Sequence, residues 1–212
     1  SSDVCSSDLS KPSTWLRGPR ASEGTWDGLS FLHIGAMASE FEFQRYKPRL
    51  ALTRSIADCD LLQVVCGTPA WAISVCGLGK PVAVQCATRA RVERRQRDAQ
   101  GLGFGGWWRK GMTAVTDRLD DRALRLADAV QVENPWMLEY ARRVNGVRQL
   151  DLRYAPPGVD ADLFAPPMRR GHFGSPYILC VARLSDPRKN IGLLLEAYAK
   201  LPLALIETTC LV

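Results

Sequence analysis

The stretch that decides the predicted fold is Tyr177–Pro202, YILCVARLSDPRKNIGLLLEAYAKLP. It opens with a short apolar run that stops at Arg183, which is long enough for a buried parallel strand. A polar turn containing Asp186 and Pro187 follows. Apolar residues then recur at helical spacing until Pro202 stops the helix. The stretch therefore predicts a strand, a turn and a helix, the repeating unit of α/β proteins.

Two cations stand at the ends of this turn, Arg183 where the strand ends and Lys189 where the helix begins. The first turn of a helix offers free N–H groups and the positive end of the helix dipole to an anion. A guanidinium can fork onto phosphate oxygens, and an ammonium adds a point charge. The pattern predicts a binding corner for an anionic ligand. The alternative is a surface turn with solvated cations.

The same stretch resembles a known family. Val181–Ile191, VARLSDPRKNI, with Leu194–Ala199, LLEAYA, is similar to the start of the C-terminal domain in family 4 glycosyltransferases, which have the GT-B fold. In that family an Arg at the end of the first strand and a Lys in the next loop hold the diphosphate of a sugar nucleotide. The resemblance implies that Arg183 and Lys189 bind the donor phosphates.

Two further segments carry the resemblance. Leu126–Asn134, LADAVQVEN, resembles a strand late in the first domain of the family, with Asn134 where Ser is usual. Pro156–Phe164, PPGVDADLF, resembles the interdomain segment P-N-G-V-D-x-x-x-F, with Pro157 in place of Asn. The resemblance thus covers roughly residues 31–206.

Apolar strands and helices alternate along the rest of the chain, which predicts a parallel sheet covered on both faces. Residues 10–30 have loop composition. The expected strands are Phe31–Ile34, Leu61–Cys66, Pro81–Cys86, Ala127–Val132, and a strand that starts with Leu203–Ile206. The expected helices are Pro48–Asp58, Ala70–Leu78, a helix led by Trp107 and Trp108, Met112–Ala127 and Pro135–Val144.

We expect an α/β, GT-B-like chain of two Rossmann-like domains, interrupted at both ends. Residues 10–152 form the N-terminal, acceptor-side domain in part, and the proline-rich residues 153–176 form a linker. Residues 177–212 begin the C-terminal nucleotide-sugar domain. Residues 1–9, SSDVCSSDL, resemble a translated sequencing adapter, and we interpret them as an artefact; a natural flexible tail is the alternative.

The composition is that of a globular protein, with 46% hydrophobic and 24% charged residues and a net charge of +6. This charge suits an anionic substrate or membrane surface and does not require nucleic acid. No apolar run approaches the roughly 20 residues of a membrane span, and no signal-peptide pattern appears. The seven Cys lack CxxC pairs and His partners, which favours buried thiols over disulfides or zinc. We expect a cytoplasmic protein.

The segment from Arg89 to Arg97 holds five arginines in nine positions. One interpretation is a solvated helix face; the other is a basic helix on an anionic membrane or a lipid-linked substrate, peripheral to the inner face of the membrane. Gly101–Gly106, GLGFGG, does not follow a strand, so we expect a flexible connection rather than a dinucleotide loop. For Trp107 and Trp108 the alternatives are packing against the domain and anchoring at a membrane interface.

The predicted function is transfer of a sugar from a nucleotide-sugar donor to an unknown acceptor, and we expect the 212-residue fragment itself to be inactive. Preorganised cations and helix N–H groups can stabilise the leaving diphosphate, so no metal cofactor is expected. Cys86 stands where many family members have a His, so no catalytic residue is carried over. The alternatives are another GT-B enzyme, such as a sugar-nucleotide epimerase or phosphorylase, and a binding or scaffold module without catalysis. The family's acidic donor-sugar motif would lie beyond Val212.

Overall fold

A computed structural model describes residues 21–38, 41–146, 151–165, 177–184, 186, 189–206 and 210–211. The chain divides into two compact units, Ser1–Pro157 and Gly158–Val212. The expected artefact at residues 1–9 lies outside the described residues, as do residues 166–176 of the expected linker.

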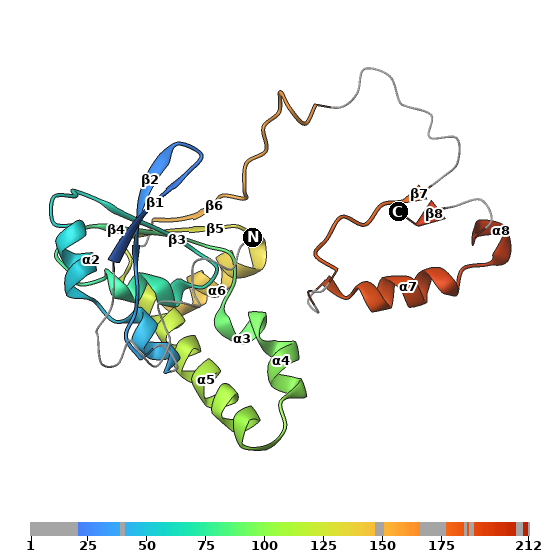
Figure 1. Ribbon diagram of the computed structural model, residues 1–212, viewed down its shortest axis with the longest axis horizontal. Coiled ribbons are helices and arrows are strands. Elements are labelled where there is room, and N and C mark those ends of the chain that lie inside the picture. The colour runs from blue at the N-terminus through green and yellow to red at the C-terminus, as the bar shows by residue number, and fades with distance from the viewer. Residues whose placement is uncertain are drawn as a thin grey trace. The chain divides into compact units, whose positions relative to one another are not determined.

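Unit 1 is built on a four-stranded parallel sheet (Figure 1). Its strands are β3 (Leu62–Cys66), β4 (Val82–Cys86), β5 (Ala129–Val132) and β6 (Asp151–Tyr154), in that order across the sheet. Three of these confirm predicted strands. β6 was not predicted, and it includes Arg153 and Tyr154, which were expected in the linker. The sheet gives a mixed α/β architecture compatible with a Rossmann-like fold.

The helices of unit 1 confirm most of the helical predictions. They are η1 (Glu42–Tyr46), α2 (Leu50–Ser55), η2 (Pro69–Ser74), α3 (Ala90–Glu93), α4 (Arg95–Gln100), α5 (Gly103–Leu126) and α6 (Pro135–Asn145). α5 joins into one helix two segments that were expected separately. The expected helix Ala70–Leu78 is a shorter 3₁₀ helix, η2.

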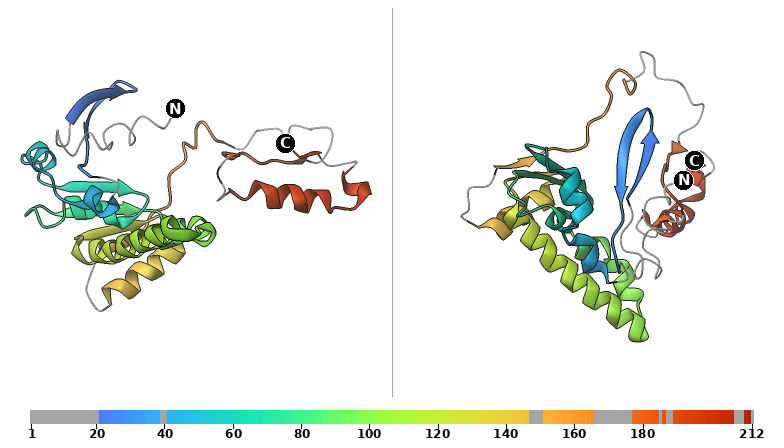
Figure 2. Two further views of the ribbon diagram at one scale, coloured as in Figure 1. Left: turned by 60° about the horizontal axis from the view of Figure 1, so that its bottom comes forward. Right: turned by 60° about the vertical axis from the view of Figure 1, so that its left-hand side comes forward.

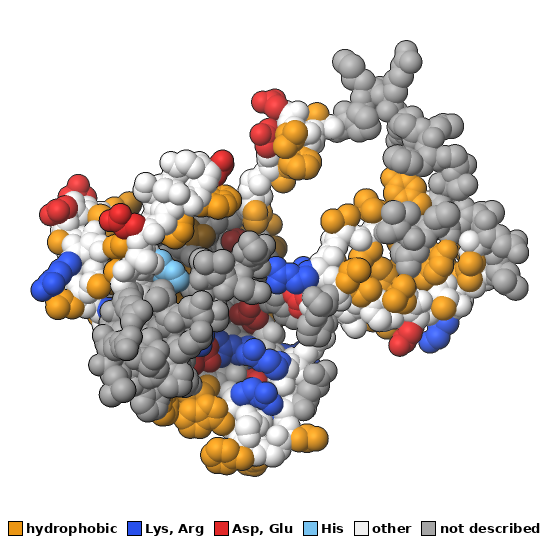
Figure 3. Space-filling model, in the orientation of Figure 1, with side chains coloured by type: hydrophobic (Ala, Val, Ile, Leu, Met, Phe, Trp, Pro, Cys, Tyr) orange, Lys and Arg blue, Asp and Glu red, His pale blue; other side chains and the backbone are white. Residues whose placement is uncertain are grey.

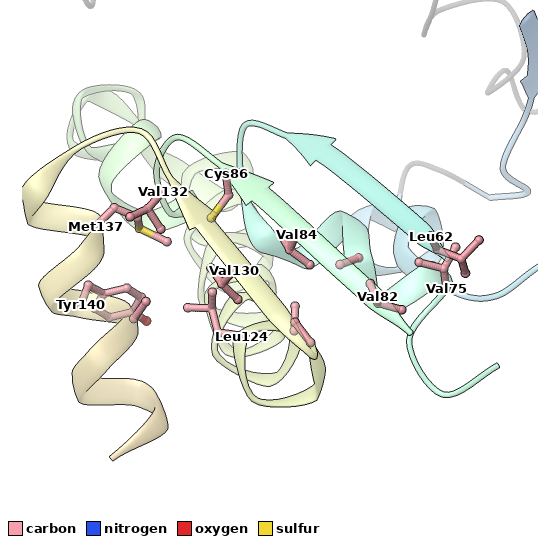
Figure 4. Packing of buried hydrophobic residues seen from close by; sticks show 14 residues of the cluster. Leu62, Val75, Val82, Val84, Cys86, Leu124, Val130, Val132, Met137 and Tyr140 are labelled. Carbon is pink, nitrogen blue, oxygen red and sulfur yellow. The ribbon is translucent and has the colours of Figure 1, made fainter. Parts of the chain in front are cut away.

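The core lies between the sheet and the helices on one of its faces. Strand side chains alternate, so that Val82, Val84 and Cys86 of β4 are buried and face α5 and α6 (Figures 2 and 4). Leu124 and Met137 are fully buried against them. The other face carries side chains that are half-buried or exposed, among them Gln63, Val65, Gln85, Gln131 and Arg153. The expectation that both faces are covered therefore holds for one face of the described sheet.

An antiparallel hairpin precedes the sheet, formed by β1 (Ala21–Trp26) and β2 (Leu29–Ile34). The expectation of a loop over residues 10–30 is wrong for residues 21–26 and for Leu29 and Ser30, while the strand expected at Phe31–Ile34 is present as part of β2. Asp27 and Gly28 have φ of 49° and 77°. Two successive residues with positive φ make a tight two-residue hairpin turn, for which Asp-Gly is a favoured sequence. That dipeptide was the signal that the loop interpretation overlooked.

Unit 2 contains β7 (Tyr177–Ile178), α7 (Ile191–Ala199), α8 (Leu203–Ile206) and β8 (Cys210–Leu211). The predicted helix after the turn is confirmed by α7. β7 is shorter than expected because its parallel pairing with β8 spans only two residues. The strand predicted to start with Leu203–Ile206 is wrong: these residues form α8, whose N–H groups at Leu205 and Ile206 donate to the carbonyl of Pro202. Short apolar runs do not separate strand from helix, and Leu and Ala favour helix.

Candidate functional site

The predicted anion corner, Arg183 and Lys189, lies in unit 2 between β7 and α7. Both side chains are exposed. The N–H of Asp186 donates to the carbonyl of Arg183 at 3.0 Å, and the N–H of Lys189 donates to the carbonyl of Asp186 at 3.0 Å. These two bonds link Arg183 to Lys189, which stands two residues before the start of α7. Ser185, Pro187 and Arg188 lie outside the described residues.

α7 begins after an unusual residue, Asn190, which has φ of 51° and ψ of 42°. Asparagine tolerates this left-handed conformation better than most residues. Its side chain makes no capping hydrogen bond to α7, while its carbonyl accepts from the N–H groups of Leu193 and Leu194. Among the described residues, none accepts a hydrogen bond from the N–H groups of Ile191 and Gly192, the first two residues of α7.

In unit 1, the loops that follow β3 and β4 meet at the carboxyl edge of the sheet, where open α/β sheets bind ligands. The carbonyl of Gly67 accepts hydrogen bonds from the N–H groups of Ala87, at 3.2 Å, and Thr88, at 2.9 Å. These bonds fix the two loops against each other. Thr88 is half-buried and Gly67 is exposed, so part of this edge remains open to solvent.

Asp120 of α5 ties both loops to the helix that lies beneath them. It is fully buried, and its two carboxylate oxygens accept from the N–H of Ala70 at 2.8 Å and from the N–H of Ala90 at 2.7 Å. These N–H groups belong to the first turns of η2 and α3. One carboxylate therefore caps two helices that are separate in the sequence. Burial raises the pKa of Asp120 to about 7.

Two further aspartates of α5, Asp117 and Asp121, form side-chain contacts close to Asp120. Asp117 forms a bidentate ion pair with Arg89, whose guanidinium lies 4.2 Å from the ring centroid of Tyr140. The Tyr140 hydroxyl donates to Asp121, and the Tyr140 ring stacks on Trp136. Asp117, Asp120 and Asp121 thus connect α5 to the segments after β3, β4 and β5. All three were missed by the sequence analysis.

The sequence contained one indication that Asp120 is buried, namely its position among the apolar residues on one face of α5. Asp120 stands three residues before Ala123 and four before Leu124, both fully buried. Residues at these spacings share one face of a helix. A carboxylate on that face must find partners in the interior, because an unpaired buried charge is costly.

Asn134, the residue that replaces the usual Ser of the resembling family, caps α6. Its side-chain oxygen accepts from the N–H of Met137 at 2.8 Å, and its side-chain nitrogen donates to the carbonyl of Ala87 at 2.6 Å. The second bond joins the end of β5 to the loop after β4. A serine hydroxyl is shorter than this amide, so the bridge depends on asparagine.

The cysteines near this edge have the properties of structural thiols. Cys86 is fully buried and burial raises its pKa, while burial raises the pKa of Cys66 to about 12. A thiol of this kind is a poor nucleophile because it stays protonated. In the described part of the chain, no three His, Cys, Asp or Glu side chains gather as a metal site would require.

Among the described residues, no helix combines the length and apolar content needed to cross a bilayer. Comparisons of the chain with protein-family models, with curated proteins and with solved structures found no match.

Proposed function

We propose that this protein is a glycosyltransferase of the GT-B type that takes its sugar from a nucleotide-sugar donor. The observation that carries the proposal is the corner in unit 2, where exposed Arg183 and Lys189 flank a turn that enters α7. A nucleotide diphosphate carries several negative charges close together. This corner can bind them with the bidentate guanidinium of Arg183, the ammonium of Lys189 and the N–H groups at the start of α7. The resemblance of Val181–Ala199 to the family supports the same ligand.

The chemistry that this corner supports is stabilisation of a leaving group. When the bond between the sugar and the diphosphate breaks, negative charge grows on the diphosphate. Fixed cations and N–H dipoles that already face that charge lower the barrier without reorganising. Arg183 is suited to hold two phosphate oxygens at once, whereas Lys189 contributes charge without a fixed geometry.

The test is titration calorimetry of UDP and GDP into the 212-residue chain and into an Arg183→Ala variant. A charge-assisted hydrogen bond contributes about 1.5–3 kcal/mol, so Arg183→Ala should weaken binding roughly ten- to a hundredfold. Arg183→Lys should restore only part of the affinity, because an ammonium lacks the bidentate fork.

Lys200→Ala is the matched control, since Lys200 is an exposed cation at the other end of α7. Its removal should leave the affinity unchanged. Equal affinity of the wild type and Arg183→Ala, with both folded, would remove the phosphate role of this corner.

A further inference from the structure

The connection between α4 and α5 is a packed corner that presents three apolar side chains to solvent. Gly106 lies against Gly101 so closely that a Cβ on Gly106 would come within 2.5 Å of the Gly101 carbonyl oxygen. Both glycines are buried. We expected a flexible connection at Gly101–Gly106, but the backbones of Gly101 and Gly106 pack closely against each other. From this corner Leu102, Phe104 and Trp107 project with 89%, 87% and 81% of their surface exposed. We call these three residues the apolar tip.

The neighbouring Trp108 packs against unit 1, unlike the exposed Trp107. Of the two expected alternatives, packing and membrane anchoring, packing therefore applies to Trp108 and not to Trp107. The Trp108 ring packs edge-on against Phe41, with ring centroids 5.6 Å apart. Trp108 thus contributes to packing within unit 1, while Trp107 has no such contact among the described residues.

Beside the apolar tip is a basic cavity of about 550 Å³ between α3, α4 and α5. Arg91 and Arg95 line it from one side, and Lys110 and Arg118 from α5. Two acids also line it: Asp98, and Asp117, which is paired with Arg89. None of the four cations pairs with a carboxylate of the described residues. Figure 3 shows Lys and Arg side chains gathered over this region, with hydrophobic side chains at its end.

Four of the five arginines in the segment from Arg89 to Arg97 fall into two groups. Arg89 and Arg94 face the body of unit 1, where they form ion pairs with Asp117 and Glu42. Arg91 and Arg95 face the cavity. The positive charge that remains available to a ligand lies next to the apolar tip, on the same helical corner.

We propose that this corner binds the surface of an anionic lipid bilayer, with the apolar tip in the interface and a lipid phosphate in the basic cavity. Aromatic side chains, tryptophan above all, concentrate at the level of the headgroups. Peripheral helices bury apolar side chains about 5–10 Å deep and hold anionic headgroups with Lys and Arg. A bilayer is the partner that uses both features, since a free anion would leave the apolar tip in water. This inference does not depend on the proposed function.

The test is co-sedimentation of the 212-residue chain with vesicles of phosphatidylcholine, with and without phosphatidylglycerol. Binding should require the anionic lipid and weaken as salt is added. Each cation near an anionic surface strengthens binding about fivefold, so the double variant Arg95→Gln/Lys110→Gln should bind about 25-fold more weakly. Phe104→Ser/Trp107→Ser should bind at least about tenfold more weakly, because less apolar surface leaves water.

Matched controls remove the same chemistry elsewhere. Arg142→Gln/Arg143→Gln deletes two exposed charges from α6, which packs near the opposite end of α5 through Tyr140 and Asp121. Trp26→Ser removes a tryptophan that is 72% exposed in the hairpin. Both controls should bind vesicles as the wild type does.

Because some variants could fail to fold, a fluorescence measurement on the folded wild type provides a separate test. Brominated lipids should quench tryptophan fluorescence of the wild type more than that of Trp107→Phe. Inorganic pyrophosphate, titrated alone, tests a free anion as the ligand of the cavity. The proposal is overturned by equal binding to both kinds of vesicle, by unchanged quenching in Trp107→Phe, or by pyrophosphate binding without vesicle binding.

Discussion

The carboxylate of Asp120 accepts a hydrogen bond from the N–H of Ala90, 30 residues earlier in the chain, at 2.7 Å. Its other oxygen accepts from Ala70, 50 residues earlier. One buried side chain therefore holds the loops after two neighbouring strands at a fixed distance from α5. Together with the hydrogen bonds to the Gly67 carbonyl and from Asn134 to the Ala87 carbonyl, Asp120 holds the loops at the carboxyl edge of the sheet in place.

Replacing Asp120 with Asn should destabilise the protein. Asparagine keeps one acceptor oxygen but presents an NH₂ group to the second backbone N–H, which then has no partner. A buried unsatisfied donor costs about 1–3 kcal/mol. The free energy of unfolding should fall by that amount in urea denaturation at a pH above the Asp120 pKa of about 7, where the carboxylate is ionised and both oxygens accept. Asp151→Asn is the control, because the Asp151–Arg153 pair is exposed and should contribute about 0–1 kcal/mol. Equal effects of the two substitutions would contradict a structural role for Asp120.

The stability should also depend on pH through Asp120. Burial raises its pKa to about 7 in the folded protein, whereas an aspartate in the unfolded chain titrates near about 4. Between these values the folded state binds more protons than the unfolded state, so stability falls as the pH rises from about 4 to about 7. The decline is on the order of 4 kcal/mol at most. The stability difference between wild type and Asp120→Asn, measured across this range, should shrink as pH rises; a constant difference would contradict the raised pKa.

Gly106→Ala should destabilise the corner between α4 and α5. The new Cβ would lie 2.5 Å from the carbonyl oxygen of Gly101 and 2.6 Å from its carbonyl carbon. Overpacking of this kind costs about 1–3 kcal/mol. Gly111→Ala, in the same helix, meets nothing within 4 Å and should stabilise it by about 0.5–1 kcal/mol. The melting temperatures of the two variants should shift in opposite directions. A shift in the same direction would show that the backbone at Gly101 moves to accommodate the new Cβ.

Asn134 is expected to have two separable roles, which Ala and Ser distinguish. Asn134→Ala removes both the cap of α6 and the bond to the Ala87 carbonyl, and loss of an N-cap alone costs about 0.5–2 kcal/mol. Asn134→Ser keeps a capping oxygen and loses only the bridge to Ala87. Urea denaturation should therefore rank the wild type above Asn134→Ser and Asn134→Ala last. Equal stability of wild type and Asn134→Ser would show that the bridge contributes nothing.

Local patterns in the sequence were sufficient for the elements whose own residues specify them. Apolar runs bounded by turn residues predicted β3, β4 and β5, and helical spacing predicted α2, α5, α6 and α7. The strand before Arg183 and the helix after Lys189 were also predicted, and β7 and α7 confirm their order. The four apolar residues Leu203–Ile206 misled the prediction because so short a run has no period.

Contacts between distant segments were decided only by the tertiary structure. The sequence shows five arginines between Arg89 and Arg97, but it cannot show that Arg94 pairs with Glu42, 52 residues away, while Arg95 lines a cavity. Nor can the run GLGFGG show that Gly101 and Gly106 pack backbone to backbone. Periodicity reports which side of an element is apolar, because that property is local. Which charge finds a partner, and which stays available to a ligand, depends on what folding brings to face it.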